Sequence, residues 1–249
     1  MKFLMKPYNT FNNKNNQKDL FFVSFQGLRK GLPWGLTRAM LPILETGKFK
    51  DKNLVYYVSI SDKYNGKVNI KEVSVIYNLF NKILLVLNRI ILKLGSHKIR
   101  LIQEIMFDFF LSLKITKGCT IVSSAYLYKT NKKNKRLGGK NILFISNPDD
   151  YFLYKLLINE QKDHNVKFID AYTYRKRVAF SLKSTRSFDK IICISSSVFD
   201  SFKSRIPSSE LNSSFYELIP NKFKFSCIDV NKHEKLTFVY IGHSVWLKG

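Results

Sequence analysis

Short runs of β-branched and aromatic residues alternate along this chain with stretches in which apolar residues recur every three or four positions. The first pattern is typical of buried strands and the second of amphipathic helices. We predict strands at residues 20–25, 54–60, 119–124, 141–145, 166–169, 190–194, 215–219 and 236–241. Strand and helix in succession predict an α/β fold, a Rossmann-like doubly wound parallel sheet with right-handed crossovers.

The longest helical pattern covers residues 73–94, and a second helix is expected at 99–113. Basic residues interrupt the first pattern, and no acidic residue lies between Glu72 and Glu104. Two interpretations fit. The helix can lie on an anionic membrane with its apolar side down, or it can be a core helix of an α/β layer, which produces the same stripe. The interruptions argue against a membrane-spanning helix.

Polar residues gather where the predicted strands end. A glycine loop follows the first strand, a polar segment at residues 147–150 follows the strand at 141–145, and Asp170 ends the next strand. Ligands of doubly wound sheets bind outside the carboxyl ends of the strands, so we expect these residues on one rim. Each also has a purely structural explanation. The glycines can serve turns, Asn147 can cap a helix whose first turn contains Asp149, and Asp170 can cap the helix after it.

The chain carries a large positive charge. Its 249 residues include 42 Lys and Arg but 18 Asp and Glu, a formal net charge of +24. Such a surface attracts nucleic acid, anionic bilayers or phosphorylated ligands, although a Lys- and Asn-rich genome would produce the same excess. The basic segment at residues 131–140 is predicted to be a solvated loop.

The cysteines and histidines indicate neither a metal site nor a disulfide framework. Cys119, Cys193 and Cys227 lie far apart without metal-ligand spacing, and the first two fall in apolar runs. Buried thiols in a reducing cytoplasm are therefore expected, with no metal and no cofactor. Residues 1–19 are predicted to be a polar lead-in, without a signal peptide or a spanning helix.

Three segments carry a resemblance in their order and spacing: FDKIICISSSVFDSF from Phe188, YELIPN from Tyr216, and FVYIGHSVWLKG from Phe238. Together they resemble the domain junction of the family 4 (group 1) glycosyltransferases of the two-domain GT-B fold. The resemblance implies an acceptor-side Rossmann-like domain at residues 20–232. Residues 233–249 would then be the linker and first strand of an incomplete donor domain.

The same resemblance implies roles for particular residues. Asp170 matches the position of the first domain that faces the reacting sugar, and Lys248 matches a lysine that holds the donor diphosphate. The chain departs from the family pattern at Lys222, where a glycine is usual, and at His243, where an arginine is usual. The expected site residues are the catalytic Asp170, the cleft residues Gly27, Lys30, Gly31, Asn147 and Asp149, and the donor-phosphate residues Gly242, His243 and Lys248.

The function implied is that of a glycosyltransferase of the hexosyltransferase type. It would move a sugar from a nucleotide sugar, its co-substrate, to a lipid-linked or polysaccharide acceptor in cell-surface polysaccharide biosynthesis. We expect it in the cytoplasm, peripheral on the inner face of the membrane. With most of the donor domain missing, the chain alone is not expected to transfer sugar. The alternative is a basic binding module without catalysis, for nucleic acid or an anionic surface. No nucleic-acid-binding motif supports nucleic acid as the partner.

Overall fold

The computed structural model of the chain describes residues 19–25, 28–29, 32–33, 44–45, 54–59, 68–165, 171–193, 195–203, 205–206 and 211–212. Its strands are β1 (Leu20–Ser24), β2 (Leu28–Arg29), β3 (Leu32–Pro33), β4 (Leu54–Val58), β5 (Ile70–Glu72), β6 (Thr120–Ser123), β7 (Lys140–Ile145), β8 (Lys190–Cys193) and β9 (Leu211–Asn212). Its helices are α2 (Val75–Leu87), the π-helix η1 (Asn88–Leu92), α3 (Ser96–Lys114), α4 (Tyr128–Arg136), α5 (Asp150–Asp163), α6 (Arg175–Thr185) and α7 (Ser196–Lys203).

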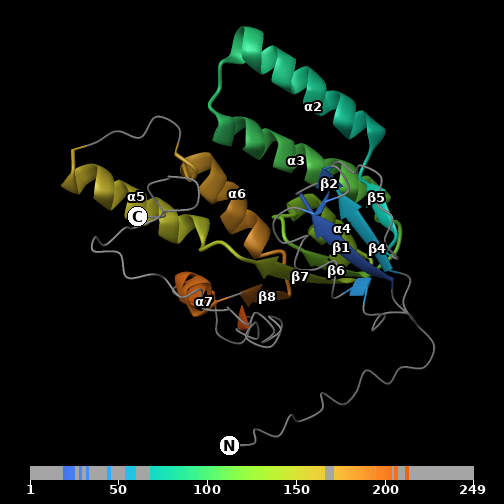
Figure 1. Ribbon diagram of the computed structural model, residues 1–249. Helices are drawn as coiled ribbons and strands as arrows, with labels where there is room; N and C mark the ends of the chain where they lie inside the picture. The colour runs from blue at the N-terminus through green and yellow to red at the C-terminus, as the bar shows by residue number, and fades with distance from the viewer. Residues whose placement is uncertain are drawn as a thin grey trace, which may run out of the picture. The chain divides into compact units, whose positions relative to one another are not determined.

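A seven-stranded sheet in the order β5-β4-β1-β6-β7-β8-β9 forms the centre of the domain, and all of its pairs are parallel (Figure 1). The chain builds one half outward from β1 through β4 to β5, and then returns to place β6 on the other side of β1. The sheet order therefore reverses between β1 and β6, which is the topological switch point of a doubly wound fold. The predicted α/β class with a Rossmann-like parallel sheet is confirmed.

Both faces of the sheet are buried, as the nearly continuous apolar strands predict. On one face, strand residues such as Val23 and Ile121 pack with Phe107 and Leu111 of α3 and with Phe202 of α7. The other face holds a smaller cluster made of Leu20, Phe22, Leu44, Tyr56, Val58 and Val68. Because side chains of a strand alternate between faces, neighbouring residues of β1 serve both clusters.

Most of the predicted elements within the described residues are confirmed. The strands expected at 20–25, 54–60, 119–124, 141–145 and 190–194 correspond to β1, β4, β6, β7 and β8, and the two long helical patterns to α2 with η1 and to α3. The strands expected at 166–169, 215–219 and 236–241 lie outside the described residues, as do the donor domain and its boundary. Cys119 and Cys193 are buried free thiols, and burial raises the pKa of each, to about 12 and about 11.

The segment at 131–140 is not the predicted solvated loop, because most of it belongs to α4. The inward side of this helix is polar: Thr130, Asn131 and Asn134 are fully buried. Asp108 of α3 accepts hydrogen bonds from the backbone N–H groups of Lys129 (2.7 Å) and Thr130 (2.9 Å) and so caps the start of α4. Buried polar residues leave no apolar stripe, so the periodicity of the sequence did not reveal this helix.

Hydrogen bonds of the Asn134 side chain attach α4 to Cys119 and Asn141. Its Oδ1 accepts from the Cys119 backbone N–H (3.0 Å), and its Nδ2 donates to the Cys119 carbonyl (3.0 Å) and to Asn141 Oδ1 (2.8 Å). Gly139 approaches so closely that a Cβ there would collide with the Asn134 side chain. Gly138, with φ at +77°, ends the turn after the helix.

We expect Asn134→Ala to lower the free energy of unfolding by about 3 kcal/mol, because several buried polar groups lose their partners at once. Lys132→Ala, at an exposed position of the same helix, is the matched control and should change stability by about 0.5 kcal/mol or less. Urea titration of the two variants measures both values. An equal small effect at both positions would show that the hydrogen bonds of Asn134 are not needed.

The start of α5 also differs from the prediction. The helix begins at Asp150, its N-cap is Asp149, and Pro148 lies before the cap rather than in the first turn. Asp149 is anchored from both sides, since its N–H donates to Ser201 Oγ (2.9 Å) and its carboxylate binds the guanidinium of Arg205. These contacts with α7 and the residues after it fix the helix start two residues later than the proposed Asn147 cap.

Candidate functional site

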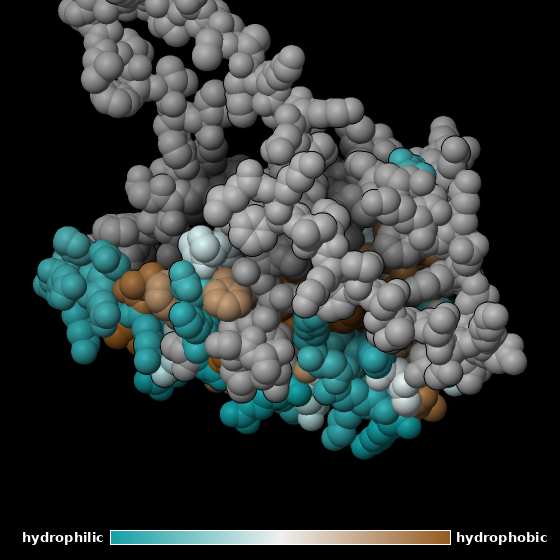
Figure 2. Space-filling view, turned by 90° about the horizontal axis from the view of Figure 1, so that it is seen from below, coloured by the Kyte–Doolittle hydropathy of each residue, from teal (hydrophilic) through white to brown (hydrophobic). Residues whose placement is uncertain are grey.

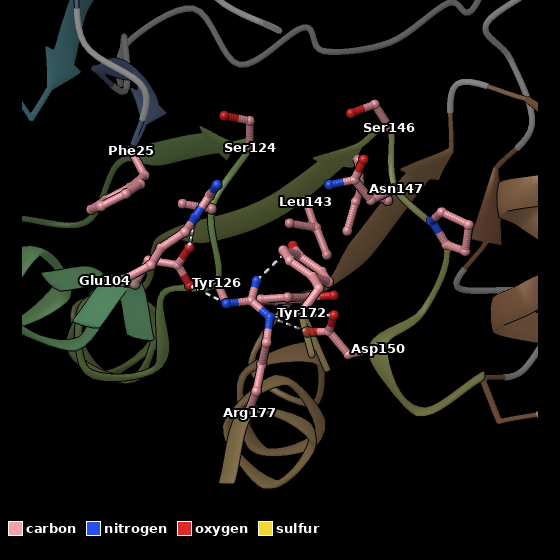
Figure 3. A pocket seen from close by; sticks show the side chains of 14 residues that line it. Phe25, Glu104, Ser124, Tyr126, Leu143, Ser146, Asn147, Asp150, Tyr172 and Arg177 are labelled. Atoms are coloured by element: carbon pink, nitrogen blue, oxygen red, sulfur yellow. Dashed lines mark hydrogen bonds and ion pairs between the residues drawn. The ribbon is translucent and has the colours of Figure 1, made fainter. Parts of the chain in front are cut away.

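A cavity of about 250 Å³ opens at the carboxyl ends of the strands that flank the switch point (Figure 3). Phe25, which follows β1, forms one side of it, and residues after β6 and β7 form the floor and the rim. Helices α3 and α6 close the remaining sides. The lining consists of Phe25, Arg100, Glu104, Ser124, Ala125, Tyr126, Leu143, Ile145, Ser146, Asn147, Pro148, Asp150, Tyr172 and Arg177. The position is the one at which open parallel sheets bind ligands.

A buried cluster of charges forms the inner wall of this pocket. Arg177 reaches from α6 between two carboxylates, as Figure 3 shows. Its Nη1 lies 3.2 Å from Glu104 Oε2, and its Nε lies 3.3 Å from Asp150 Oδ2. Arg177, Glu104 and Asp150 are only 3%, 8% and 2% exposed, so these charges are almost wholly removed from solvent. Charges at such depth persist only when they are paired.

The two carboxylates of the cluster are held differently. Glu104 accepts hydrogen bonds from two guanidiniums, Arg177 (3.2 Å) and Arg100 (3.0 Å). Among the described residues, Asp150 receives one long side-chain hydrogen bond, from Arg177 Nε to Oδ1 at 3.5 Å. Its Oδ2 is buried and has no hydrogen-bond donor among the residues that the structure describes, although Arg177 lies close to it. A buried polar atom without a hydrogen-bond partner is rare in proteins, which marks Asp150 as a candidate functional residue of the pocket wall.

Burial perturbs the titration of this cluster. It raises the pKa of Asp150 to about 7, while the charge of Arg177 works in the opposite direction. For Arg177 burial alone would lower the pKa, but Glu104 and Asp150 outweigh it and the net shift is upward. Asp150 is therefore poised to gain or release a proton near neutral pH, whereas Arg177 stays charged.

Tyr172 connects the cluster to the pocket opening. Its hydroxyl accepts a hydrogen bond from Arg177 Nη2 (2.8 Å), and the same guanidinium lies over its ring at 4.3 Å from the centroid. Burial raises the pKa of the phenol. Tyr172 therefore keeps its proton and can donate it in a hydrogen bond to a ligand. With Phe25 as an apolar surface and Ser124 and Ser146 on the rim, the pocket suits a small ligand that carries hydroxyl groups.

The structure brings one predicted site residue to this pocket. Asn147 lines its rim and is exposed. Asp149 does not line it, because its carboxylate turns to Arg205. The expected residues Gly27, Lys30, Gly31, Asp170, Gly242, His243 and Lys248 lie outside the described residues. Among the residues that are described, no group of three or more His, Cys, Asp or Glu side chains is placed to hold a metal ion.

The charged cluster was not found from the sequence. Glu104 and Arg177 are 73 positions apart, and each sits in a helix where charged residues are ordinary. Asp150 belongs to the polar segment at residues 147–150, where an acid is expected at the start of a helix for structural reasons alone. To find the cluster one must know that α3 and α6 lie beside the switch point, and the order of the elements alone does not determine this placement.

The fold and the pocket define a Rossmann-like α/β domain with a candidate ligand pocket at its switch point. No family model matches the chain, and no curated protein matches it. Among solved structures it is similar to TcCGT1 in complex with UDP, at 12% identity and a TM-score of 0.41, over 80% of this chain and 49% of that one. It is also similar to a UGT transferase from Siraitia grosvenorii in complex with UDP, at 12% identity and a TM-score of 0.38, over 77% and 46%. The chain thus spans about half the length of either protein.

Proposed function

We propose that this chain carries the acceptor-side domain of a glycosyltransferase that uses a nucleotide sugar. The observation that carries the proposal is the pocket at the switch point, whose wall holds a buried carboxylate oxygen without a hydrogen-bond donor among the described residues. The order of the three segments that resemble the GT-B domain junction supports the reaction class. A lipid-linked or polysaccharide acceptor and a place in cell-surface polysaccharide biosynthesis are the finer parts of the proposal.

In this proposal an acceptor hydroxyl binds beside Asp150. Its oxygen attacks the anomeric carbon of the donor sugar, the bond from that carbon to the nucleotide diphosphate breaks, and the diphosphate leaves with the bonding electrons. The hydroxyl proton passes to Asp150, because a base whose pKa lies near the working pH is effective in such a transfer. Asp170 remains the candidate that the sequence proposes for the same role. Gly242, His243 and Lys248 are proposed to contact the donor phosphates.

The experiment has two parts, binding and transfer. Short glycans should bind the 249-residue chain in isothermal titration, and Ser146→Trp at the pocket rim should abolish that binding. Ser196→Trp, at an exposed position of α7, is the matched control and should leave it unchanged. The protein in the longest form that its gene encodes should transfer sugar from a nucleotide sugar to the glycan that binds. Glycan binding that survives Ser146→Trp, or an absence of transfer with every donor and bound glycan, would contradict the proposal.

A further inference from the structure

Helix α2 and the π-helix η1 expose an apolar surface that the domain does not use for its own packing. Most of the outward-facing side chains are large and hydrophobic, with exposed fractions between 41% and 79%. They are Val75, Ile76, Leu79, Ile83, Leu85, Val86, Leu87, Ile90, Ile91 and Leu92. We call these ten residues the α2–η1 surface. Single exposed apolar residues are normal, but a contiguous set of this size marks a site of interaction.

The opposite side of α2 attaches the helix firmly to the domain. Tyr77, Asn81 and Leu84 are its buried residues. The ring of Tyr77 packs edge-on against Phe107 and Phe110 of α3, at centroid distances of 5.8 and 6.2 Å. Figure 1 shows α2 alongside α3, on the side of α3 that faces away from the sheet. The exposed surface is therefore the outer face of a docked helix.

The connection to α3 is equally well defined. Asn88 Nδ2 donates to the Leu94 carbonyl (3.2 Å), and Asn88 Oδ1 accepts from the Leu94 N–H (2.8 Å). Lys93 adopts the left-handed conformation, with φ at 44°, and turns the chain into α3. These contacts fold η1 back toward the domain, so α2 and η1 lie along α3 rather than extending away from it.

The buried stripe is narrow and the exposed surface wide. At 100° per residue, the exposed apolar residues of α2 span roughly 200° of the helix circumference. Only 17% of the window Val75–Leu92 is buried, and its length and composition would allow it to cross a membrane. A protein partner usually covers one face of a helix, whereas a fluid apolar medium can cover such a wide arc. By contrast, the face seen from below in Figure 2 shows mostly hydrophilic side chains among the described residues.

The charges of this region indicate that the medium has a negatively charged surface. Lys82, Arg89 and Lys93 are exposed on the same segment, and no acidic residue occurs between Glu72 and Glu104. Long basic side chains can bury their methylene groups among apolar neighbours and reach outward with their charge. An apolar helix with interspersed cations fits the boundary between the acyl chains and the headgroups of an anionic bilayer.

We propose that the α2–η1 surface lies in the plane of an anionic lipid bilayer and holds the domain on its surface. The apolar side chains enter the acyl region, and Lys82, Arg89 and Lys93 bind lipid phosphates. The core-helix interpretation of residues 73–94 does not fit the observed exposure. This inference requires no catalysis, so it can be tested and can fail separately from the proposed glycosyl transfer.

The test is co-sedimentation of the 249-residue chain with vesicles of phosphatidylcholine and phosphatidylglycerol, compared with vesicles of phosphatidylcholine alone. We expect binding to the mixed vesicles that weakens as salt screens the charges. Changing Lys82, Arg89 and Lys93 to Gln should weaken binding on the order of 100-fold, since each basic residue near an anionic surface contributes about fivefold. Changing Leu79, Val86 and Ile90 to Gln should weaken vesicle binding by a similar factor. It should also remove the part of the binding that persists at high salt.

The matched control changes three exposed basic residues of other helices, Lys132, Arg136 and Lys162, to Gln. It lowers the net charge equally and should weaken binding by no more than about threefold. All substituted positions are exposed, and circular dichroism and thermal unfolding verify that each variant is folded. The proposal is overturned if the chain does not bind the vesicles, or if the control loses as much binding as the Lys82, Arg89 and Lys93 variant. It is also overturned if the bound chain resists alkaline carbonate extraction, as a spanning helix does. A dimer in solution that dissociates in the Leu79, Val86 and Ile90 variant would show instead that the surface binds a second copy of the chain.

Discussion

Replacing Asp150 with Asn is expected to slow sugar transfer by about 10²–10⁴-fold, the usual contribution of a positioned proton acceptor. The amide has nearly the same shape as the carboxylate, so it fits the space beside Arg177, but it cannot take the hydroxyl proton. The loss should appear in kcat more than in KM, because acceptor binding depends on the whole pocket. Steady-state kinetics of the longest gene-encoded form measure both constants. Asp163→Asn, at an exposed position of the same helix, is the control and should be unaffected.

The pH profile gives an independent test of this role. Burial raises the pKa of Asp150 to about 7 despite the neighbouring Arg177. Only the deprotonated carboxylate can act as a base, so kcat/KM should rise with pH up to about 7 and then level off. Asp150→Asn should remove this dependence. If it keeps full activity and the profile while Asp170→Asn loses both, then Asp170 is the base and Asp150 only helps to hold Arg177.

Replacing Arg177 with Met should lower the free energy of unfolding by about 3–5 kcal/mol, because Glu104 and Asp150 would remain buried without their shared countercharge. Arg100→Met is the matched comparison. The side chain of Arg100 is 40% exposed, and Glu104 is its ion-pair partner among the described residues, so its loss should cost about 1 kcal/mol or less. Arg177→Lys keeps the charge but not the planar guanidinium, so its loss of free energy of unfolding should lie between the losses of the other two variants. Equal losses for Arg177→Met and Arg100→Met would contradict the importance of the buried cluster.

The deficit of Arg177→Met should depend on pH in a definite direction. In the folded protein the pKa of Asp150 is about 7, above the value of about 3.9 for an unfolded aspartate. Proton binding to Asp150 therefore favours the folded state, fully below about pH 4, and this contribution is lost as the pH rises through about 7. Protonated Asp150 needs no countercharge. The deficit should thus be smaller near pH 5 than near pH 8, and urea titrations at the two values measure the difference.

The parallel sheet could be predicted because its strands are buried on both faces and are therefore apolar at nearly every position, as in β1. Helix α4 could not, since its inward side is made of Thr130, Asn131 and Asn134. Their burial depends on Asp108 of α3, a tertiary contact that no local pattern shows. The exposure of α2 could not be predicted either, because a core helix and an interfacial helix have the same periodicity.

The edge of the sheet at which the pocket opens could be predicted, but the residues of its inner wall could not. The switch point follows from the order of strands and helices, and Asn147 was expected at the rim where it lies. Glu104 and Arg177 come from helices distant in sequence, and their pairing depends on how α3 and α6 cover the ends of the strands. Charged residues in helices are usually solvated, so the sequence offers no reason to select these two.

Helix α3 belongs to two surfaces at once: one side carries Arg100 and Glu104 into the pocket, and another supports Tyr77 of α2. If α2 and η1 lie in a leaflet as proposed, the pocket is within about one helix diameter, roughly 10 Å, of the lipid-bound helix. An acceptor that is itself anchored in that leaflet then reaches the pocket by lateral diffusion in two dimensions. Its effective concentration at the pocket is set by its mole fraction in the leaflet rather than by its content in the bulk solution. A water-soluble analogue of the same acceptor has no such advantage and depends on its affinity for the pocket alone.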